Sequence, residues 1–76
     1  MMYEAWLCFR HKGEWERVCV GVYPEHVAKY VLMNINQYYH GDLAFWNEDS
    51  HQVFIKDTRW IGHAAGFIWP VNRPKR

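Results

Sequence analysis

Apolar and polar residues alternate over two stretches near the start of the chain, residues 3–10 and residues 15–23. A period of two, with many aromatic and β-branched side chains, is typical of half-buried strands. Gly13 lies between the two stretches and supplies the positive φ that a tight hairpin turn needs. The pattern therefore predicts a β-hairpin. Its apolar face is expected to comprise Ala5, Leu7, Phe9, Val18, Val20 and Val22.

The register of this hairpin depends on where the turn is centred, either on residues 12–13 or one residue later. Both choices keep the apolar residues on one side of the sheet. The later turn would face Arg10 with Arg17 and Cys8 with Cys19. Like charges that face each other across two strands destabilise the pairing, so we expect the earlier turn.

An amphipathic helix is expected directly after the hairpin. Pro24 suits the first helical position, where no backbone N–H is needed, and Gly41 suits the left-handed residue that ends a helix. Apolar residues between them recur at steps of three and four, as in a helix with one buried side. Glu25 and Lys29 are spaced to form an ion pair on its exposed side. The apolar stripe consists of Val27, Ala28, Val31, Leu32, Ile35 and Tyr38 or Tyr39.

The second half of the chain contains further strand patterns. A short apolar run at residues 43–46, a polar turn and a strand at residues 51–56 predict a second hairpin. Residues 59–61 and 67–69 then flank a connection rich in glycine and alanine. They fit either a final pair of strands or one strand with an irregular segment, and Pro70 ends the pattern.

Together these elements predict an α+β fold of two layers. One helix packs on one face of an antiparallel sheet of four to five strands, in the order β-β-α-β-β(-β). Residues 1–70 form a single domain in this interpretation, and residues 71–76 form a basic, flexible C-terminal tail.

Composition narrows the class of protein. The chain has 76 residues, of which 50% are hydrophobic, and a net charge of +1. This composition excludes a disordered chain, and the length excludes a multidomain enzyme. We expect neither a membrane span nor a secretory signal, and therefore a cytoplasmic protein, located in the host cytoplasm if a phage encodes it.

A single helix leaves the other face of the sheet without a cover. Six residues of the first hairpin point to that side: Trp6, Cys8, Arg10, Trp15, Arg17 and Cys19. Either the C-terminal segment folds over this surface, or Trp6 and Trp15 are presented to solvent or to a partner. Tyr30 likewise falls off the predicted core. The aromatic rings expected inside the core are those of Phe9, Phe45 and Phe54.

The sequence contains no recognisable motif for catalysis, metal binding or cofactor binding. Ser50 and His51 are adjacent in a turn, without the glycines of a nucleophile elbow. Cys8 and Cys19 match no common zinc spacing and are too few for a disulfide scaffold, so we expect two reduced thiols. The five histidines are spread along the chain without a common metal-binding spacing. We therefore expect no enzyme, no metal and no cofactor.

Charge is distributed unevenly along the chain. Residues 42–57 contain four acidic residues and one lysine, whereas residues 58–76 contain four basic residues and no acidic residue. The acidic segment is suited to a basic partner surface. A nearly neutral chain lacks the field that nonspecific binding to duplex DNA requires.

Residues 3–39 combine an opening strand YEAWLCF, a turn HKGEW, a strand ERVCVGVY and a helix PEHVAKYVLMNINQYY. This layout, with the small size and the aromatic content, resembles the hairpin-then-helix plan of small phage accessory proteins. Some of those proteins, anti-CRISPR proteins among them, inhibit host defence enzymes. The resemblance covers half of the chain and transfers no site residue. It implies a protein that acts by occluding a surface of a larger host complex.

The leading hypothesis is a non-enzymatic protein-binding module, an inhibitor of a host nucleic-acid-handling complex. Trp, Tyr and Arg dominate binding hot spots, and acidic residues of an exposed turn would engage basic residues of the partner. Its expected contact residues are Trp6, Trp15, Arg17, Tyr30, Glu48 and Asp49. No membrane partner is expected.

The alternative hypothesis is a protein that binds single-stranded nucleic acid. Bases would stack on the same tryptophans, and basic side chains would hold the phosphates. The basic residues are Arg10, Arg73, Lys75 and Arg76. Glu4, Glu14 and Glu16 lie beside the tryptophans in the sequence and weigh against it. A third hypothesis is a homodimer formed through the uncovered sheet face.

Overall fold

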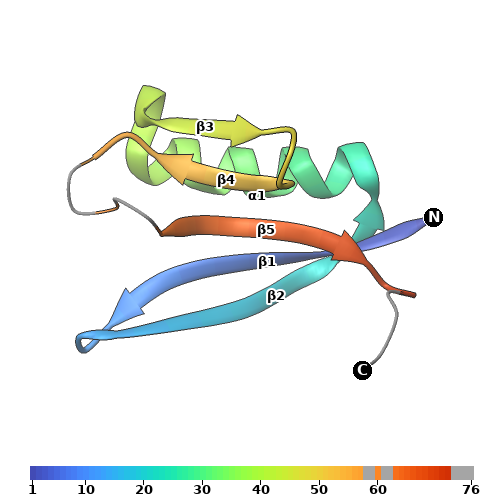
Figure 1. Cartoon of the computed structure of the whole chain (residues 1–76), viewed down its shortest axis with the longest axis horizontal. Helices are drawn as coiled ribbons and strands as arrows, with labels where there is room; N and C mark the ends of the chain where they lie inside the picture. Colours follow the sequence, from blue (N-terminus) through green and yellow to red (C-terminus); the bar gives the residue numbers. More distant parts are fainter. Residues whose placement is uncertain (58–59, 61–62, 73–76) are drawn as a thin grey trace.

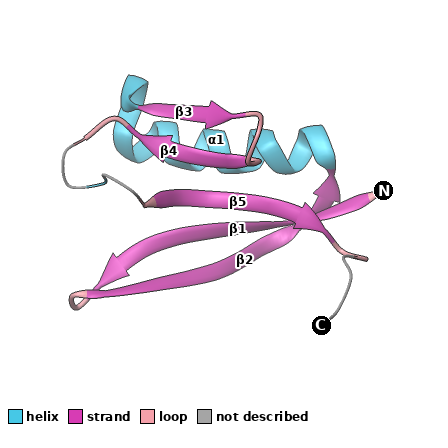
Figure 2. Cartoon of the chain, in the orientation of Figure 1, coloured by secondary structure: helices cyan, strands magenta, loops and turns pink. Residues whose placement is uncertain are grey.

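The structure of the chain, a computed structural model, describes residues 1–57, 60 and 63–72. These residues form five strands and one α-helix (Figures 1 and 2). The elements in chain order are β1 (Met2–His11), β2 (Glu14–Pro24), α1 (Glu25–His40), a short 3₁₀ helix η1 (Gly41–Leu43), β3 (Ala44–Asn47), β4 (Gln52–Ile55) and β5 (Ala64–Pro70).

The five strands form one antiparallel sheet in the order β2-β1-β5-β4-β3. In Figure 1, α1 lies behind the sheet, and the hairpin of β1 and β2 curves away from it. The predicted α+β fold of two layers is therefore confirmed. β5 enters the sheet between β1 and β4, so it extends the sheet and does not fold over it. In the part of the chain that the structure describes, no helix has the length and apolar character needed to cross a bilayer.

The further strand predicted at residues 59–61 is not confirmed. Arg59 and Ile61 lie outside the described residues, and Trp60 between them is not part of a strand. Trp60 instead packs against one of the two buried clusters of the core, which contains Val53 and Ala65.

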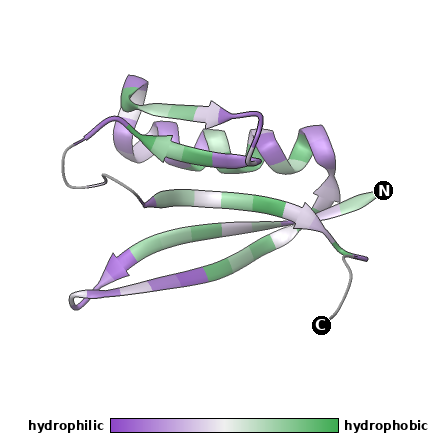
Figure 3. Cartoon of the chain, in the orientation of Figure 1, coloured by the Kyte–Doolittle hydropathy of each residue, from purple (hydrophilic) through white to green (hydrophobic). Residues whose placement is uncertain are grey.

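The first hairpin adopts the register that keeps the two arginines apart. Arg10 pairs with Trp15 and Arg17 pairs with Cys8, so the expected earlier turn is confirmed. Lys12 and Gly13 both have a positive φ, 53° and 81°, which is the conformation of a two-residue hairpin turn. The tip of the hairpin is hydrophilic (purple in Figure 3), as a solvent-exposed turn requires. Both cysteines are free thiols.

A β-bulge in β2 changes which residues face α1. Val20 is an extra residue between Cys19 and Gly21, which pair with successive residues of β1. An extra residue reverses the alternation of sides along a strand. Val22 therefore lies opposite Glu4, on the face away from α1. The prediction that the three valines of β2 share one face is wrong for Val22.

Tyr23 closes this bulge. Its hydroxyl donates a hydrogen bond of 3.1 Å to the backbone oxygen of Val20, and its ring lies against the backbone of Gly21. Gly21 has a φ of 151°, and a Cβ atom there would overlap the Tyr23 ring. Only glycine fits this position without strain.

We expect Gly21→Ala to lower the free energy of unfolding by about 1–3 kcal/mol, because the added methyl group must displace the Tyr23 ring and occupy an unfavourable φ. Chemical denaturation measures this change. In a Tyr23→Leu background the same substitution should cost less, since the clash with the ring is gone. Equal costs in the two backgrounds would contradict the role of Tyr23.

The core between α1 and the sheet is centred on Leu32. Leu32 is fully buried, and a Cβ atom at Gly66 of β5 would lie 3.4 Å from it. The buried row of α1 continues from Leu32 to Asn36, whose Nδ2 donates to the Leu32 backbone oxygen at 2.9 Å. The predicted end of the apolar stripe is wrong, because Tyr38 and Tyr39 are 83% and 72% exposed. Residues four apart share one side of a helix, and this row ends at Asn36.

Candidate binding surface on the open face of the sheet

The side of the sheet that faces away from α1 is here called the open face. Neighbouring residues of a strand point to opposite sides. Ala5 and Ile68 are buried against α1, so the residues next to them point away from it. β1 and β5 contribute Glu4, Trp6, Cys8, Arg10, Phe67 and Trp69 to the open face. β2, β3 and β4 contribute Trp15, Arg17, Cys19, Phe45, Gln52 and Phe54.

Three aromatic rings of β1 and β5 pack against one another on the open face. The rings of Trp6 and Phe67 are almost parallel, with centres 6.1 Å apart, and Trp69 meets Phe67 edge-on at 5.0 Å. Trp6 Nε1 donates a hydrogen bond of 3.1 Å to the Glu4 carboxylate, and Trp69 Nε1 donates to the same oxygen. Glu4 thus holds both indoles in place. All three rings remain partly exposed.

Trp15 is held by contacts on several sides. His63 stacks on it with ring centres 4.4 Å apart, and Trp60 meets it edge-on at 5.2 Å. The guanidinium group of Arg10 lies 5.6 Å from the centre of the indole and also donates to the Gly13 backbone oxygen at 2.8 Å. These contacts fix the orientation of Trp15 at one end of the open face.

Basic side chains border the aromatic rings. The guanidinium group of Arg17 lies 5.6 Å from the centre of Trp6, and Lys56 Nζ lies 5.3 Å from the centre of Phe45. Such contacts between a cation and a ring are attractive. The basic residues predicted in the tail, Arg73, Lys75 and Arg76, lie outside the described residues.

Two of the three acidic residues near the tryptophans in the sequence face the other side of the sheet. Glu14 and Glu16 flank Trp15 along β2 and therefore point away from the open face. On that side, the Glu16 carboxylate lies 3.0 Å from His11 Nδ1. Glu4 is on the open face, where its carboxylate binds two indole N–H groups. The charge that remains on this face is predominantly positive.

Phe45 and Phe54, predicted to be core residues, lie on the open face instead. They pair across β3 and β4 with ring centres 5.9 Å apart, and Phe45 is 37% exposed. The buried residues of these two strands are Ala44, Val53 and Ile55. Because the small Ala44 takes the inward position, the alternation places the larger Phe45 outside.

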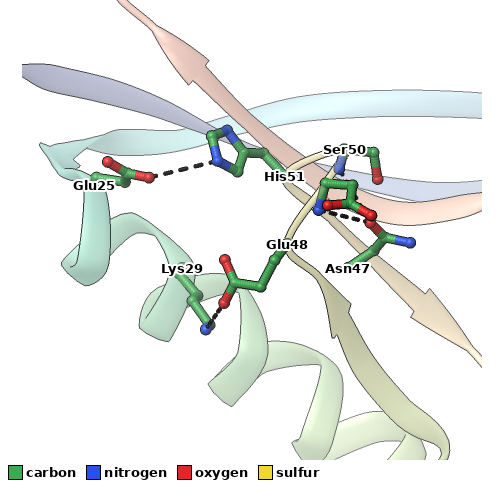
Figure 4. Close-up of polar contacts among 7 residues, drawn as sticks. Glu25, Lys29, Asn47, Glu48, Ser50 and His51 are labelled. Atoms are coloured by element: carbon green, nitrogen blue, oxygen red, sulfur yellow. Dashed lines mark hydrogen bonds and ion pairs between the residues drawn. The ribbon is translucent and has the colours of Figure 1, made fainter.

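The acidic residues predicted to bind a partner belong to a different part of the molecule. Glu48 and Asp49 lie in the turn between β3 and β4, and Glu48 lies next to the first turns of α1 (Figure 4). Lys29 Nζ lies 2.7 Å from a Glu48 carboxylate oxygen, and His51 Nε2 lies 3.5 Å from Glu25. The predicted pair between Glu25 and Lys29 is thus replaced by two contacts that fasten the turn to α1.

Tyr30 is also remote from the tryptophans. It is 64% exposed on α1, in the layer opposite the open face. Together with the turn that carries Glu48 and Asp49, it lies outside the candidate surface. The predicted contact residues that share the open face are Trp6, Arg10, Trp15 and Arg17.

The contact between Lys29 and Glu48 predicts a dependence of stability on pH. The hydrogen bond from Lys29 lowers the pKa of the Glu48 carboxyl below its ordinary value. A carboxyl whose pKa is lower in the folded state stabilises that state above its unfolded pKa, and this contribution is lost as the pH falls through the folded pKa. We expect Glu48→Gln to be less stable than the natural protein at neutral pH, with the difference vanishing in acid.

Urea denaturation along a pH series measures this difference. Asp49→Asn is the matched control, since none of the described residues forms an ion pair with Asp49. A difference for Glu48→Gln that stays constant down to strongly acidic pH would contradict the role of the ion pair.

The environment of Cys8 does not activate its thiol as a nucleophile. Burial raises the pKa of the Cys8 thiol above its ordinary value, and the positive charge of Arg17 opposes this only in part. A thiol with a raised pKa stays protonated at neutral pH and reacts slowly. Among the described residues, no group of three His, Cys, Asp or Glu side chains could hold a metal ion.

We expect iodoacetamide to modify Cys19 faster than Cys8 in the folded protein at mildly alkaline pH. Cys19 is exposed, whereas Cys8 is half-buried with a raised pKa. Mass spectrometry of the digested protein gives both rates. The rates should converge in concentrated urea, where burial no longer acts, and equal rates in the folded protein would contradict the described environment of Cys8.

Two hollows adjoin the first hairpin. One of about 580 Å³ lies on the helix side, between the end of α1 and β1, and is lined by Phe9, Asn36 and Tyr39 among others. Another of about 350 Å³ lies on the open face, and its lining includes Trp15 and Phe67. The second hollow is continuous with the aromatic surface described above.

Alternation in the sequence is sufficient to place several residues of the open face on one side of a strand. Phe67 and Trp69 alternate with the buried Ile68, and Gln52 alternates with the buried Val53 and Ile55. His63 has no such signal. Nothing in the sequence places β5 beside β1, and that pairing brings these residues next to the first hairpin.

The chain was compared with protein-family models, with curated proteins and with solved structures, and none of the three comparisons found a match. The geometry of the open face is therefore the basis for assigning a function.

Proposed function

We propose that the protein is a non-enzymatic binding module whose open face holds single-stranded nucleic acid. The observation that carries this proposal is the partly exposed aromatic surface of β1 and β5, bordered by Arg10, Arg17 and Lys56. Proteins that bind single strands stack unpaired bases on aromatic rings and hold the phosphates with basic side chains. The open face offers both groups on one rigid sheet.

The distribution of charge supports a nucleic acid over a protein partner. The hypothesis of a protein partner combines the tryptophans with Glu48 and Asp49. Trp6 and Trp15 lie on the open face, whereas the turn that carries Glu48 and Asp49 is fastened to α1. The acidic residues that weigh against nucleic acid, Glu14 and Glu16, point away from the open face. An anionic strand therefore meets mainly positive charge there.

A protein partner remains the second candidate function. Glu4 lies between the indoles of Trp6 and Trp69, where its negative charge disfavours a phosphate, and clustered Trp and Arg residues are typical of protein hot spots. A phage-type inhibitor that occludes a host complex would use the same surface. This function predicts binding to a protein, lost on substitution of Trp15, with no affinity for oligonucleotides.

Binding to a fluorescent oligouridine or oligothymidine, measured by polarisation at increasing salt, tests the proposal. Three phosphate contacts give a slope of about −2 for log K against log salt, which is an affinity loss of about 20-fold for a fourfold rise in salt. Removing two of the cations with Arg17→Gln and Lys56→Gln should reduce this slope to about −0.7. Lys29→Gln removes one positive charge from the helix layer and should leave the affinity unchanged.

Removal of one stacking ring is the complementary test. We expect Phe67→Leu to weaken binding by about 5- to 150-fold, the usual effect of one base–aromatic stack. Tyr30→Leu removes an exposed ring from α1 and serves as the control. If the natural protein shows no affinity for either oligonucleotide at low salt, the proposed function is wrong.

A further inference from the structure

The hollow on the open face has the composition of a pocket for a single base. Its volume is about 350 Å³, and it opens beside the aromatic rings that would stack the rest of the strand. Its lining includes Cys8, Trp15, Arg17, Gln52, His63 and Phe67, and also Glu16 and Ala64. These residues come from four strands, β1, β2, β4 and β5, and from the segment before β5, so the pocket exists only in the folded sheet.

The aromatic walls of the hollow are fixed before any ligand arrives. Trp15 and His63 are stacked within 18° of parallel, and Trp60 braces the Trp15 ring edge-on. Phe67 is held by the rings of Trp6 and Trp69. A planar group that enters such a pocket loses little free energy to ordering of the protein, because the rings are already in place.

Two polar side chains of the hollow are available for recognition. Within the described part of the chain, no hydrogen bond or ion pair occupies the side-chain amide of Gln52 or the guanidinium group of Arg17. A glutamine amide presents one acceptor and one donor side by side. Adenine presents a matching donor and acceptor at N6 and N7, and this pairing is a common form of base recognition. Arg17, across the hollow, is suited to a phosphate.

We propose that this hollow holds one unpaired adenine of a bound strand, with its N6 and N7 edge on the Gln52 amide and a neighbouring phosphate on Arg17. This inference rests on the proposed function and adds a base preference to it. The remaining rings of the open face bind bases without discrimination, because every base has a face that can stack. The preference is therefore confined to one position of the strand.

The test compares the affinity for an oligouridine with the affinity for the same strand carrying one central adenosine. The comparison is repeated in the deoxyribose form, with oligothymidine and one central deoxyadenosine. The natural protein should bind the strand with adenine about 5- to 150-fold more tightly, the usual effect of one bidentate contact to a base. Gln52→Leu should reduce the ratio of the two affinities to about one. Gln37→Leu, which removes an exposed amide from α1, should retain the preference for the strand with adenine. The two sugar forms show whether RNA or DNA is preferred.

A third strand, with purine in place of adenine, gives a test that needs no variant. Purine lacks the 6-amino group but keeps N7, so it can form only one of the two hydrogen bonds to the Gln52 amide, and the natural protein should bind this strand more weakly than the strand with adenine. Equal affinity for the adenine and purine strands, or a preference for adenine over purine that survives in Gln52→Leu, overturns the adenine pocket while the proposed function stands. Failure of the natural protein to bind any of the strands overturns both and favours a protein partner.

Discussion

A sheet of five strands has two faces, and the single helix of 16 residues can cover only one of them. The rest of the structure depends on this constraint. Leu32 anchors α1 over Gly66, and that contact fixes which side of the sheet is covered. β5 would cover the second face only if it lay across that face. Instead it pairs with β1 and β4 within the sheet. Those pairings satisfy its backbone hydrogen bonds, and none of the described residues forms a second layer over the rings of the open face.

Side-chain contacts within the open face compensate for the missing layer. Trp6, Phe67 and Trp69 bury part of their area against one another. Glu4 accepts hydrogen bonds from both indole N–H groups, which would otherwise need water as a partner. The same alternation that places these rings on one side sorts the charges of β2, with Arg17 toward the rings and Glu16 away from them. Stability of the sheet and a surface suited to an anionic, ring-bearing ligand therefore arise from one pattern.

Much of the fold follows from local patterns in the sequence. Period-two alternation, the helical stripe and the turn glycine predict the hairpin, α1 and the two-layer architecture, and the repulsion of facing arginines predicts the hairpin register. Prediction fails where a single residue changes which side of the sheet the following residues of a strand face. The bulge at Val20 turns Val22 outward, and the inward position of Ala44 turns Phe45 outward. Pairings between distant segments, such as that of Lys29 with Glu48, have no local signal.

The central claim is that the open face is accessible to solvent, and nuclear magnetic resonance with a soluble paramagnetic probe tests it most directly. The ring protons of Trp6, Phe67 and Trp69 should be relaxed strongly by the probe, approaching the effect on the exposed ring of Tyr30, whereas the methyl groups of Leu32 should be protected. Protection of all three rings to the level of Leu32 would mean that another layer covers the sheet, and would contradict the account.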